Sequence, residues 1–251
     1  MTRWLQGFLV LGWMAFFTAS CGGGNSNGGG SSGPDTSSLA GTWFGVYEYA
    51  GSSNTLGSIS VVVSSHGTFT YTITGTPNAG SGSGTLSSAA NGIWSTDIGG
   101  TSGGFIVDSS FTPAHAAFAE YGRNYAVLQK GGTALPSVLP ADIAHPWNGS
   151  GVYLSGPYMD ITQTFGLQLT IANSGTLPFS GSQTPGGSFL GSLPSQGFMS
   201  TYGLVMGTVT QSAITSNIHV LITQDKGFAG YWACPQGTFI YPDDCGFGAL
   251  R

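Results

Sequence analysis

The strict alternation of apolar and polar side chains in residues 68–74 constrains the fold of this chain more than any other feature. In this segment, TFTYTIT, the apolar residues Phe69, Tyr71 and Ile73 occupy every second position and threonines occupy the others. Because successive side chains of a β-strand point to opposite faces, the pattern predicts an antiparallel strand with one buried face. The preceding segment, SISVVVSS, alternates in the same way, and the SHG at its end predicts a hairpin turn.

Strand patterns of this kind run to the C-terminus, whereas no segment has the periodicity of a helix longer than two turns. Further apolar strand segments are Ile218, Val220 and Ile222, then residues 228–232 and 238–241. Many short strands joined by tight turns predict an all-β fold of antiparallel up-and-down meanders. Closing each meander into a β-barrel removes its exposed strand edges, and a β-sandwich is the alternative.

The strand pattern repeats in the second half of the chain. Residues 59–71 align with residues 167–179 without a gap, and the alignment places Val61 on Leu169. GTWFGVY near the start of the first half meets PWNGSGVY in the second, and AHAAFAEYG meets NIHVLITQDKG near their ends. This conserved order of signals within one chain predicts two tandem, superposable barrel units.

Composition excludes some classes of function. Charged residues make up 6% of the 251 residues, the mean hydropathy is +0.15 and the formal net charge is −5, whereas globular proteins average about 25% charged residues. Low charge at this hydropathy argues against intrinsic disorder. Beyond residue 20 the only basic residues are Arg123, Lys130, Lys226 and Arg251. Four such side chains are too few for the basic patch that phosphate backbones need, so we expect no binding to nucleic acid.

The N-terminus carries the pattern of an export signal. Arg3 is followed by an uncharged and mostly apolar run at residues 4–17 and then by the small residues TAS. A transmembrane helix needs about 20 apolar residues, and this run is shorter and is interrupted by glycines. We therefore expect a secretory signal peptide at residues 1–20.

A single cysteine, Cys21, follows this segment. The stretch TASC resembles the lipobox of bacterial lipoproteins, although Thr18 stands where those proteins prefer leucine. The resemblance implies cleavage before Cys21, attachment of lipid such as palmitate to that residue, and a lipid-anchored place in the cell envelope. Two or three acyl chains hold a protein stably on a membrane. Glycine rather than aspartate follows the cysteine, which in enterobacterial lipoproteins implies the outer membrane.

A glycine- and serine-rich segment, GGGNSNGGGSSGPDTSS, follows Cys21 and occupies residues 22–38, so that the lipidated cysteine and the tether together span residues 21–38. It contains no apolar side chain, so we expect a flexible tether with a reach of roughly 20–25 Å. The predicted globular parts are a first barrel unit at residues 39–131, a proline-rich linker at 132–144 and a second barrel unit at 145–251.

Two further cysteines, Cys234 and Cys245, bracket the segment PQGTFIYPDD. If Cys21 carries lipid, an even pair remains, and the oxidising cell envelope favours a disulfide between them. Two free thiols are the alternative. A disulfide that closes a loop of this size contributes about 2–3 kcal/mol in the chain-entropy account.

The first unit begins with GTWFGVY, in which Gly41, Trp43, Gly45 and Tyr47 are similar to the first strand of lipocalin-like (calycin) domains. In that family the tryptophan packs at the closed end of the barrel, often against an arginine from a late strand. The resemblance implies this structural role for Trp43 and Arg123.

The second unit departs from this motif. Trp147 occupies the tryptophan position, but His145 stands at the first glycine position and no arginine lies in the late strands. The resemblance implies a core role for Trp147 and carriage of a small apolar ligand inside a barrel. Small barrels also fill their interiors with their own side chains, and this is the alternative to a cavity.

Motifs for catalysis or metal binding are weak. GTSGG at residues 100–104 fits G-x-S-x-G, but a nucleophile elbow needs a strand-to-helix turn. His115 and His219 align between the two units, and alternation places both on outward faces, which predicts surface histidines. Glu48 and Glu120 lie on strands that barrel closure brings together, as a candidate acid pair. No ligand set with the spacing of a metal site is visible, so we expect no metal, no cofactor and no enzymatic activity.

Tyrosines are the remaining candidates for recognition, since tyrosine beside Gly, Ser and Asn is typical of recognition loops. They are Tyr47, Tyr49, Tyr121, Tyr125, Tyr153, Tyr158, Tyr202, Tyr231 and Tyr241. We therefore expect non-catalytic binding of a protein or glycan partner at the envelope. Carriage of a small apolar ligand inside a barrel is the alternative.

Overall fold

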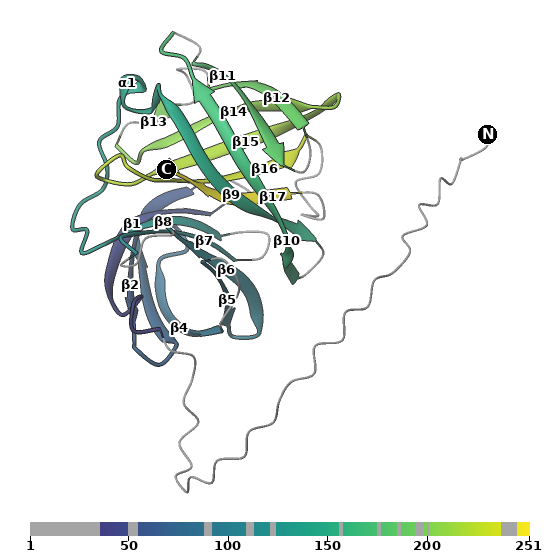
Figure 1. The fold of residues 1–251 in the computed structure, drawn as a ribbon. Coiled ribbons are helices and arrows are strands. Elements are labelled where there is room, and N and C mark those ends of the chain that lie inside the picture. The colour runs from purple at the N-terminus through teal and green to yellow at the C-terminus, as the bar shows by residue number, and fades with distance from the viewer. Residues whose placement is uncertain are drawn as a thin grey trace, which may run out of the picture. The chain divides into compact units, whose positions relative to one another are not determined.

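A computed structural model of the chain shows an almost entirely β-stranded protein (Figure 1). It describes residues 36–49, 55–87, 92–108, 113–120, 124–155, 158–174, 177–184, 187–193, 198–199, 201–236 and 245–251. The predicted signal peptide, Cys21, most of the tether and Arg123 lie outside these residues, so the expectations for them stay predictions. Within the described residues, no helix has the length and apolar character to cross a membrane.

The first eight strands form a closed antiparallel barrel, called barrel 1, that is seen as a ring in Figure 1. Each strand pairs with the next along the chain, and β1 pairs with β8 to close the ring. The strands are β1 (Gly41–Tyr49), β2 (Thr55–Val63), β3 (Thr68–Thr74), β4 (Gly80–Ser87), β5 (Ile93–Ile98), β6 (Thr101–Val107), β7 (His115–Glu120) and β8 (Asn124–Lys130).

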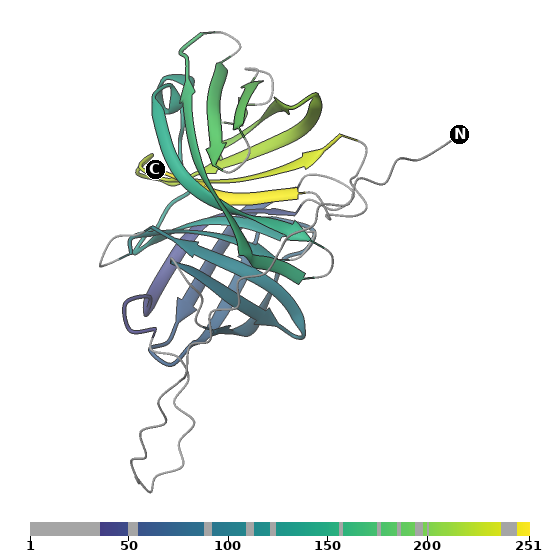
Figure 2. The ribbon, with the colours of Figure 1, turned by 45° about the vertical axis from the view of Figure 1, so that its right-hand side comes forward.

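The remaining strands form a second antiparallel barrel, barrel 2, with the same up-and-down order (Figure 2). Strand β17 pairs with β9, and β12 pairs with β14, so that eight strands close the ring while the two-residue β13 adds to β14. The strands are β9 (Pro146–Ser155), β10 (Tyr158–Ile171), β11 (Pro178–Thr184), β12 (Gly187–Ser192), β13 (Phe198–Met199), β14 (Leu204–Gln211), β15 (Ile214–Ile222), β16 (Ala229–Pro235) and β17 (Cys245–Leu250).

The prediction of two tandem antiparallel barrels is confirmed, and the β-sandwich alternative does not apply. Strand β3 shows why the pattern was informative, because Phe69 is buried in the barrel while the threonines of TFTYTIT are exposed. The predicted hairpin turn connects β2 to β3, and its Gly67 has a φ of 80°, a left-handed conformation that glycine adopts without steric cost.

Both barrels are closed off at one end in the same way, by a buried tryptophan near the start of the first strand. The indole Nε1 of Trp43 donates a hydrogen bond to the carbonyl oxygen of Leu39, and that of Trp147 donates to Ile143, both at 2.9 Å. Each carbonyl belongs to a turn just before the strand, the second one being the short helix α1 (Pro140–Ile143). The tryptophan thus fastens the incoming chain over the end of its barrel.

A glycine two residues after each tryptophan lets the first and last strands approach closely. A Cβ atom at Gly45 would lie 1.8 Å from the carbonyl oxygen of Val127, and one at Gly149 would lie 1.9 Å from that of Ala249. Real Cβ atoms do not come this near to backbone atoms. The W-x-G signal shared by the two units therefore has one physical cause, which is closure of the barrel.

Residues 32–251 belong to one compact unit, whose buried apolar side chains fall into three clusters. Two clusters line the interiors of the barrels. The third consists of outward-facing residues contributed by both barrels, and it forms the interface between them. Its largest members from barrel 2 are Phe228, Trp232 and Phe247, which meet Tyr125 and Val127 of barrel 1.

The predicted correspondence of His115 with His219 is wrong. His115 begins β7, the seventh strand of barrel 1, whereas His219 lies in β15, the sixth strand of barrel 2. The aligned segments share apolar alternation, and alternation alone does not distinguish one strand of a meander from the next.

Candidate ligand-binding site

Aromatic rings lying flat against glycines keep the interior of barrel 1 open. A Cβ atom at Gly82 would lie 2.5 Å from the Tyr71 hydroxyl oxygen, and one at Gly84 would lie 2.5 Å from the Phe69 ring. Strand β4, GSGSGTLS, therefore leaves space along the wall that the two rings of β3 occupy. An eight-stranded barrel is only just wide enough to fill with side chains, so rings placed against the wall leave the centre free.

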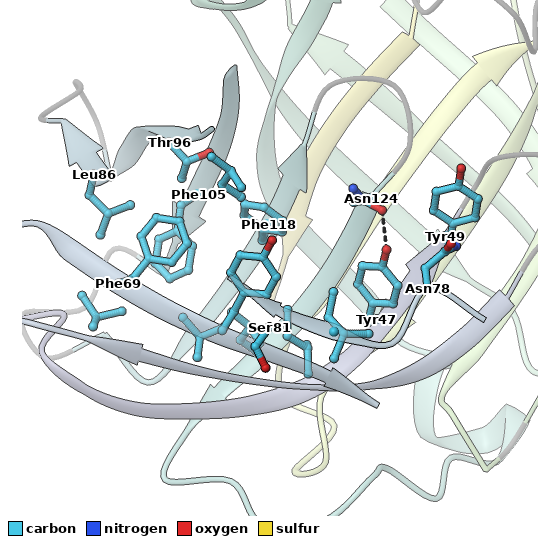
Figure 3. A pocket seen from close by; sticks show the side chains of 18 residues that line it. Tyr47, Tyr49, Phe69, Asn78, Ser81, Leu86, Thr96, Phe105, Phe118 and Asn124 are labelled. Atoms are coloured by element: carbon cyan, nitrogen blue, oxygen red, sulfur yellow. Dashed lines mark hydrogen bonds between the residues drawn. The ribbon is translucent and has the colours of Figure 1, made fainter. Parts of the chain in front are cut away.

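The result is a cavity of about 380 Å³ in barrel 1. Figure 3 shows that Phe69, Leu86 and Phe105 lie at one end of it and that Tyr49, Asn78 and Asn124 lie at the other. Ligand sites in proteins measure roughly 300–1,000 Å³ and combine apolar walls with a few placed polar groups. The alternative, in which a unit of this size fills its own interior with side chains, does not hold for barrel 1.

The polar groups of this cavity are all uncharged in the part of the chain that the structure describes. The Tyr47 hydroxyl donates a hydrogen bond to Asn124 Oδ1 near the mouth (Figure 3). Thr96 lies in the wall and is 3% exposed, and its hydroxyl has no hydrogen-bond partner among the described residues. A buried hydroxyl without a partner costs about 1–3 kcal/mol, which marks Thr96 as the polar point of an otherwise apolar wall.

The opposite end of barrel 1 is covered by the chain that enters it. The Thr36 hydroxyl donates to the carbonyl oxygen of Ser64 at 2.7 Å and accepts from the Gly67 amide at 2.8 Å, so this residue is held against the β2–β3 hairpin. Lys130 donates to the Ser38 carbonyl oxygen at 3.0 Å. These bonds leave the end with Tyr49, Asn78 and Asn124 as the mouth.

Barrel 2 contains a separate cavity of about 500 Å³. The same device keeps it open, because a Cβ atom at Gly181 would lie 2.5 Å from the Phe189 ring and one at Gly191 would lie 2.1 Å from the Phe179 ring. Its walls are mainly apolar, and polar side chains at its mouth are Gln183, Gln211, Ser212 and Ser216.

The interface between the barrels contains a buried polar cluster. His219 Nδ1 lies 2.5 Å from Glu48 Oε1, and Trp232 Nε1 donates to Glu48 Oε2 at 3.1 Å. Glu48 is fully buried and His219 is 5% exposed. Burial and, to a lesser extent, the Glu48 carboxylate raise the pKa of the Tyr125 phenol above its usual range, so Tyr125, which stacks on Trp232, stays protonated.

This cluster corrects one expectation. His219 faces outward from barrel 2 as alternation predicted, but it is not a surface histidine, because barrel 1 covers it. Glu48 bonds with His219 and Trp232; the side chain of Glu120, its predicted partner, lies outside the described residues, so the acid pair stays a prediction. Neither Glu48 nor His219 lines a barrel cavity, so the pair fits a role in joining the barrels.

A second histidine–carboxylate contact joins the barrels, and here the histidine belongs to barrel 1 and the carboxylate to barrel 2. His115 of barrel 1 lies between two carboxylates, with Nδ1 3.1 Å from Asp108 Oδ2 and Nε2 2.6 Å from Asp225 Oδ2 of barrel 2. Its ring also stacks on Phe228. Burial raises the pKa of Asp225, but hydrogen bonds from His115, Thr223 and the Gly227 amide outweigh this effect and leave it below its usual range.

The positively charged side chain that lies over the Trp43 ring is that of Lys130, whose Nζ is 5.7 Å from the ring centroid. Arg123, which the family resemblance implied for this place, lies outside the described residues. Trp147 instead carries the stacked ring of His145 at 4.3 Å. Sequence reasoning missed Lys130, although pairing of the ends of β1 and β8 would have placed it opposite Trp43.

The predicted disulfide between Cys234 and Cys245 is confirmed. It joins the ends of β16 and β17 beside the mouth of barrel 2, where Pro235 and Gly246 line the cavity. GTSGG forms the hairpin between β5 and β6 and the start of β6, not a strand-to-helix turn.

Comparisons with known proteins give matches among solved structures alone. No family model and no curated protein matches the chain. Among solved structures, the chain is similar to a protein of unknown function from the DUF3598 family of Nostoc punctiforme, with 11% identity and a TM-score of 0.37. The likeness covers 85% of this chain and 94% of that one.

Proposed function

We propose that this protein binds a small, mostly apolar ligand in the lumen of barrel 1. The observation that carries the proposal is the cavity of about 380 Å³, with apolar walls and with uncharged polar groups at its mouth. Burial of apolar surface contributes about 25 cal/mol per Å², and the hydroxyl and amide groups of Tyr47, Tyr49, Asn78 and Asn124 orient the polar end of the ligand.

The tyrosines favour carriage inside a barrel over recognition at the surface. Tyr47, Tyr125 and Tyr231 are buried, and Tyr49 and Tyr202 are half-buried, while the other tyrosine side chains of the recognition hypothesis lie outside the description. Tyr47 and Tyr49 line the barrel 1 cavity, and Tyr125 belongs to the interface. Binding of a protein or glycan partner through the loops stays a prediction.

The proposal includes a lipid anchor on Cys21 and a place at the bacterial outer membrane. It rests on the resemblance of TASC to a lipobox and on the apolar run before it. The up-and-down barrel with a tryptophan at its closed end supports the lipocalin-like interpretation. A tethered carrier of this kind collects or delivers an apolar molecule close to the membrane.

The ligand proposal is tested by filling the lumen. Val61 faces the cavity and Val62, the next residue, is 50% exposed, so Val61→Trp and Val62→Trp form a matched pair. The neutral dye N-phenyl-1-naphthylamine gains fluorescence in apolar sites and serves as the probe. We expect Val61→Trp to weaken its binding to barrel 1 by at least about tenfold, which is 1.4 kcal/mol, and Val62→Trp to leave it unchanged. Equal binding by the two variants would contradict the proposal.

The anchor is tested separately. Cys21→Ser should release the protein from the envelope fraction or leave its signal uncleaved, while wild-type protein should yield an N-terminal peptide with acyl mass. An N-terminal peptide without acyl mass would remove the anchor and leave the ligand proposal unaffected.

A further inference from the structure

We infer that the lumen of barrel 2 is a second binding site, loaded independently of barrel 1, and that it accepts uncharged apolar ligands and rejects anionic lipids. The inference goes beyond the proposed function, which concerns barrel 1. Three observations carry it: the shape of the second cavity, its separation from the first, and the absence of basic side chains from its described lining residues.

The shape of the second cavity is built by its own residues. Phe179 and Phe189 lie over Gly191 and Gly181, and the Tyr231 hydroxyl lies 2.5 Å from where a Cβ atom of Gly248 would be. The pairs on β11 and β12, the third and fourth strands of barrel 2, correspond to those on β3 and β4 in barrel 1, and the pair on β16 and β17 is an additional one. The arrangement that opens the first lumen is thus present in the second, which a barrel that only needed a packed core would not require.

The two cavities share no lining residue. Between them lies the interface cluster, in which Val46 and Val127 of barrel 1 pack with Val152 and Phe247 of barrel 2. Protein interiors of this kind are close-packed, so occupation of one lumen does not obstruct the other. The expected stoichiometry is two ligands per chain.

Charge determines which ligands the second lumen accepts. Residues 146–251 contain only two Lys or Arg residues, Lys226 and Arg251, and one histidine, His219, which is buried in the interface between the barrels. Lys226 Nζ is 2.8 Å from Asp142 Oδ2, and the Arg251 backbone pairs with Asn148, next to Trp147. Both therefore belong to the closed end of barrel 2.

The mouth of barrel 2 lies at the opposite end of the strands. Among the residues that the structure describes, none of those that line this cavity is Lys, Arg or His. An ionised carboxylate placed in an apolar lumen without a partner loses its hydration without compensation. A neutral head group avoids this cost, because the amides of Gln183 and Gln211 and the Ser216 hydroxyl are uncharged hydrogen-bonding groups.

The first experiment counts sites in the full chain with N-phenyl-1-naphthylamine. Leu169 lines the second cavity as Val61 lines the first, and Thr170 is exposed as Val62 is. Wild type should bind two dye molecules, Val61→Trp and Leu169→Trp one each, and the double variant none. Thr170→Trp, the matched control, should bind two.

The outcomes separate this inference from the proposed function. Binding of one dye molecule by wild type that Leu169→Trp does not reduce would overturn the second site and leave barrel 1 as the carrier. Binding lost only in Leu169→Trp would keep the second site and contradict the barrel 1 proposal. Absence of dye binding in folded wild type overturns both. Far-UV circular dichroism of each variant checks that the barrels are intact.

The second experiment tests the chemistry in the Val61→Trp background, where the dye reports barrel 2 alone. At pH 8 a carboxylic acid is ionised, so 1-dodecanol and dodecanoate present the same chain with a neutral or an anionic head. Dodecanol should displace the dye at a concentration at least about tenfold lower than dodecanoate, a difference of 1.4 kcal/mol. Ser216→Lys should reduce the difference between the dodecanol and dodecanoate concentrations that displace the dye, whereas Thr215→Lys, on the outer face, should not change it. Equal or better displacement by dodecanoate would overturn the exclusion of anions.

Discussion

The two barrels are built alike at their closed ends and differently at their mouths. At the closed ends, Trp43 and Trp147 make the same indole hydrogen bond at the same distance, and the glycines two residues later meet the last strand in the same way. At the mouths, barrel 1 presents tyrosine and asparagine while barrel 2 presents glutamine and serine. A disulfide holds β16 to β17 in barrel 2, and barrel 1 contains no cysteine.

This difference separates two requirements of the fold. Closing an eight-stranded meander depends on a close approach between its first and last strands, so the residues at that seam have few alternatives. The mouth carries no such constraint, because loops tolerate change, and its residues are free to differ with the ligand. The comparison predicts that substitutions at the seams have large and equal effects in both barrels, whereas substitutions at the mouths change binding more than stability.

The largest effect is expected from the seam glycines. Gly45→Ala and Gly149→Ala each place a Cβ atom within 2 Å of a backbone carbonyl oxygen, and backbone has to move to make space. We expect each to lower the free energy of unfolding by about 4 kcal/mol, above the usual 1–3 kcal/mol for overpacking, as measured by urea unfolding.

Gly80→Ala and Gly166→Ala are the matched controls, one in each barrel. A Cβ atom at Gly80 meets nothing within 4 Å, and one at Gly166 meets only the Thr184 carbonyl oxygen at 3.9 Å. These should be neutral or slightly stabilising, because alanine is favoured over glycine within strands by about 0.5–1 kcal/mol. If Gly45→Ala lowers the free energy of unfolding and Gly149→Ala does not, the two seams are not equivalent.

The next effect concerns the contact that joins the barrels. Glu48→Leu leaves His219 and the Trp232 indole buried without their acceptor, and breaking a buried pair costs about 3–5 kcal/mol. We expect a loss near the lower limit, about 3 kcal/mol, in urea unfolding. Replacing both partners, in Glu48→Leu with His219→Leu, should recover most of it, because apolar residues suit this interface. If the double variant is as unstable as Glu48→Leu alone, the loss of stability does not come from leaving His219 without its partner.

A smaller effect is expected from the two tryptophans. Trp43→Phe and Trp147→Phe remove the indole N–H that donates to the carbonyl of Leu39 or Ile143. The Ile143 carbonyl oxygen also accepts from the His145 amide at 2.9 Å, so it keeps a donor after the change. An orphaned buried polar group costs about 1–3 kcal/mol, so we expect a loss of about 2 kcal/mol for Trp43→Phe and a smaller loss, about 1 kcal/mol, for Trp147→Phe. Thermal unfolding followed by circular dichroism measures both. Equal losses would show that the second donor to Ile143 does not compensate.

The sequence predicts the barrels well because both depend on local patterns. Alternation in TFTYTIT and the W-x-G repeat act over a few residues, and each has one physical cause. The disulfide was equally predictable, because an oxidising compartment and an even number of remaining cysteines both indicate that Cys234 pairs with Cys245.

The interface was not predicted, and the choice between open and filled barrels was left undecided, because both depend on how strands pack across the fold. His219 was placed on the correct face, but its burial requires a second barrel over that face. The continuous apolar run of β8, YAVL from Tyr125 to Leu128, carried the signal, since a strand buried on both faces loses its alternation. The open lumens were likewise signalled by GSGSG in β4, where glycines at inward positions leave room for rings.

The smallest expected effect is a dependence of stability on pH at the second contact between the barrels. Asp225 is held below its usual pKa, and the ordinary value is about 3.9. Its carboxylate therefore stabilises the folded protein at pH values above about 4, and this contribution is lost as the pH falls further. Because the Asp225 side chain is 41% exposed, solvent screens the pair, and exposed pairs contribute about 0.2–1 kcal/mol. Asp225→Asn should flatten the acid limb of the unfolding free energy between pH 5 and pH 3 by less than about 1 kcal/mol. The groups facing Asp225 are His115, Thr223 and the Gly227 amide.

Asp142→Asn is the matched control, because the pKa of Asp142 is also lowered, by its hydrogen bond from Lys226, but this pair does not cross between the barrels. If His115 connects the barrels through Asp225, combining Asp225→Asn with His115→Gln should add nothing further, whereas combining Asp142→Asn with His115→Gln should be additive. Additivity in the first pair would mean that His115 acts through Asp108 alone.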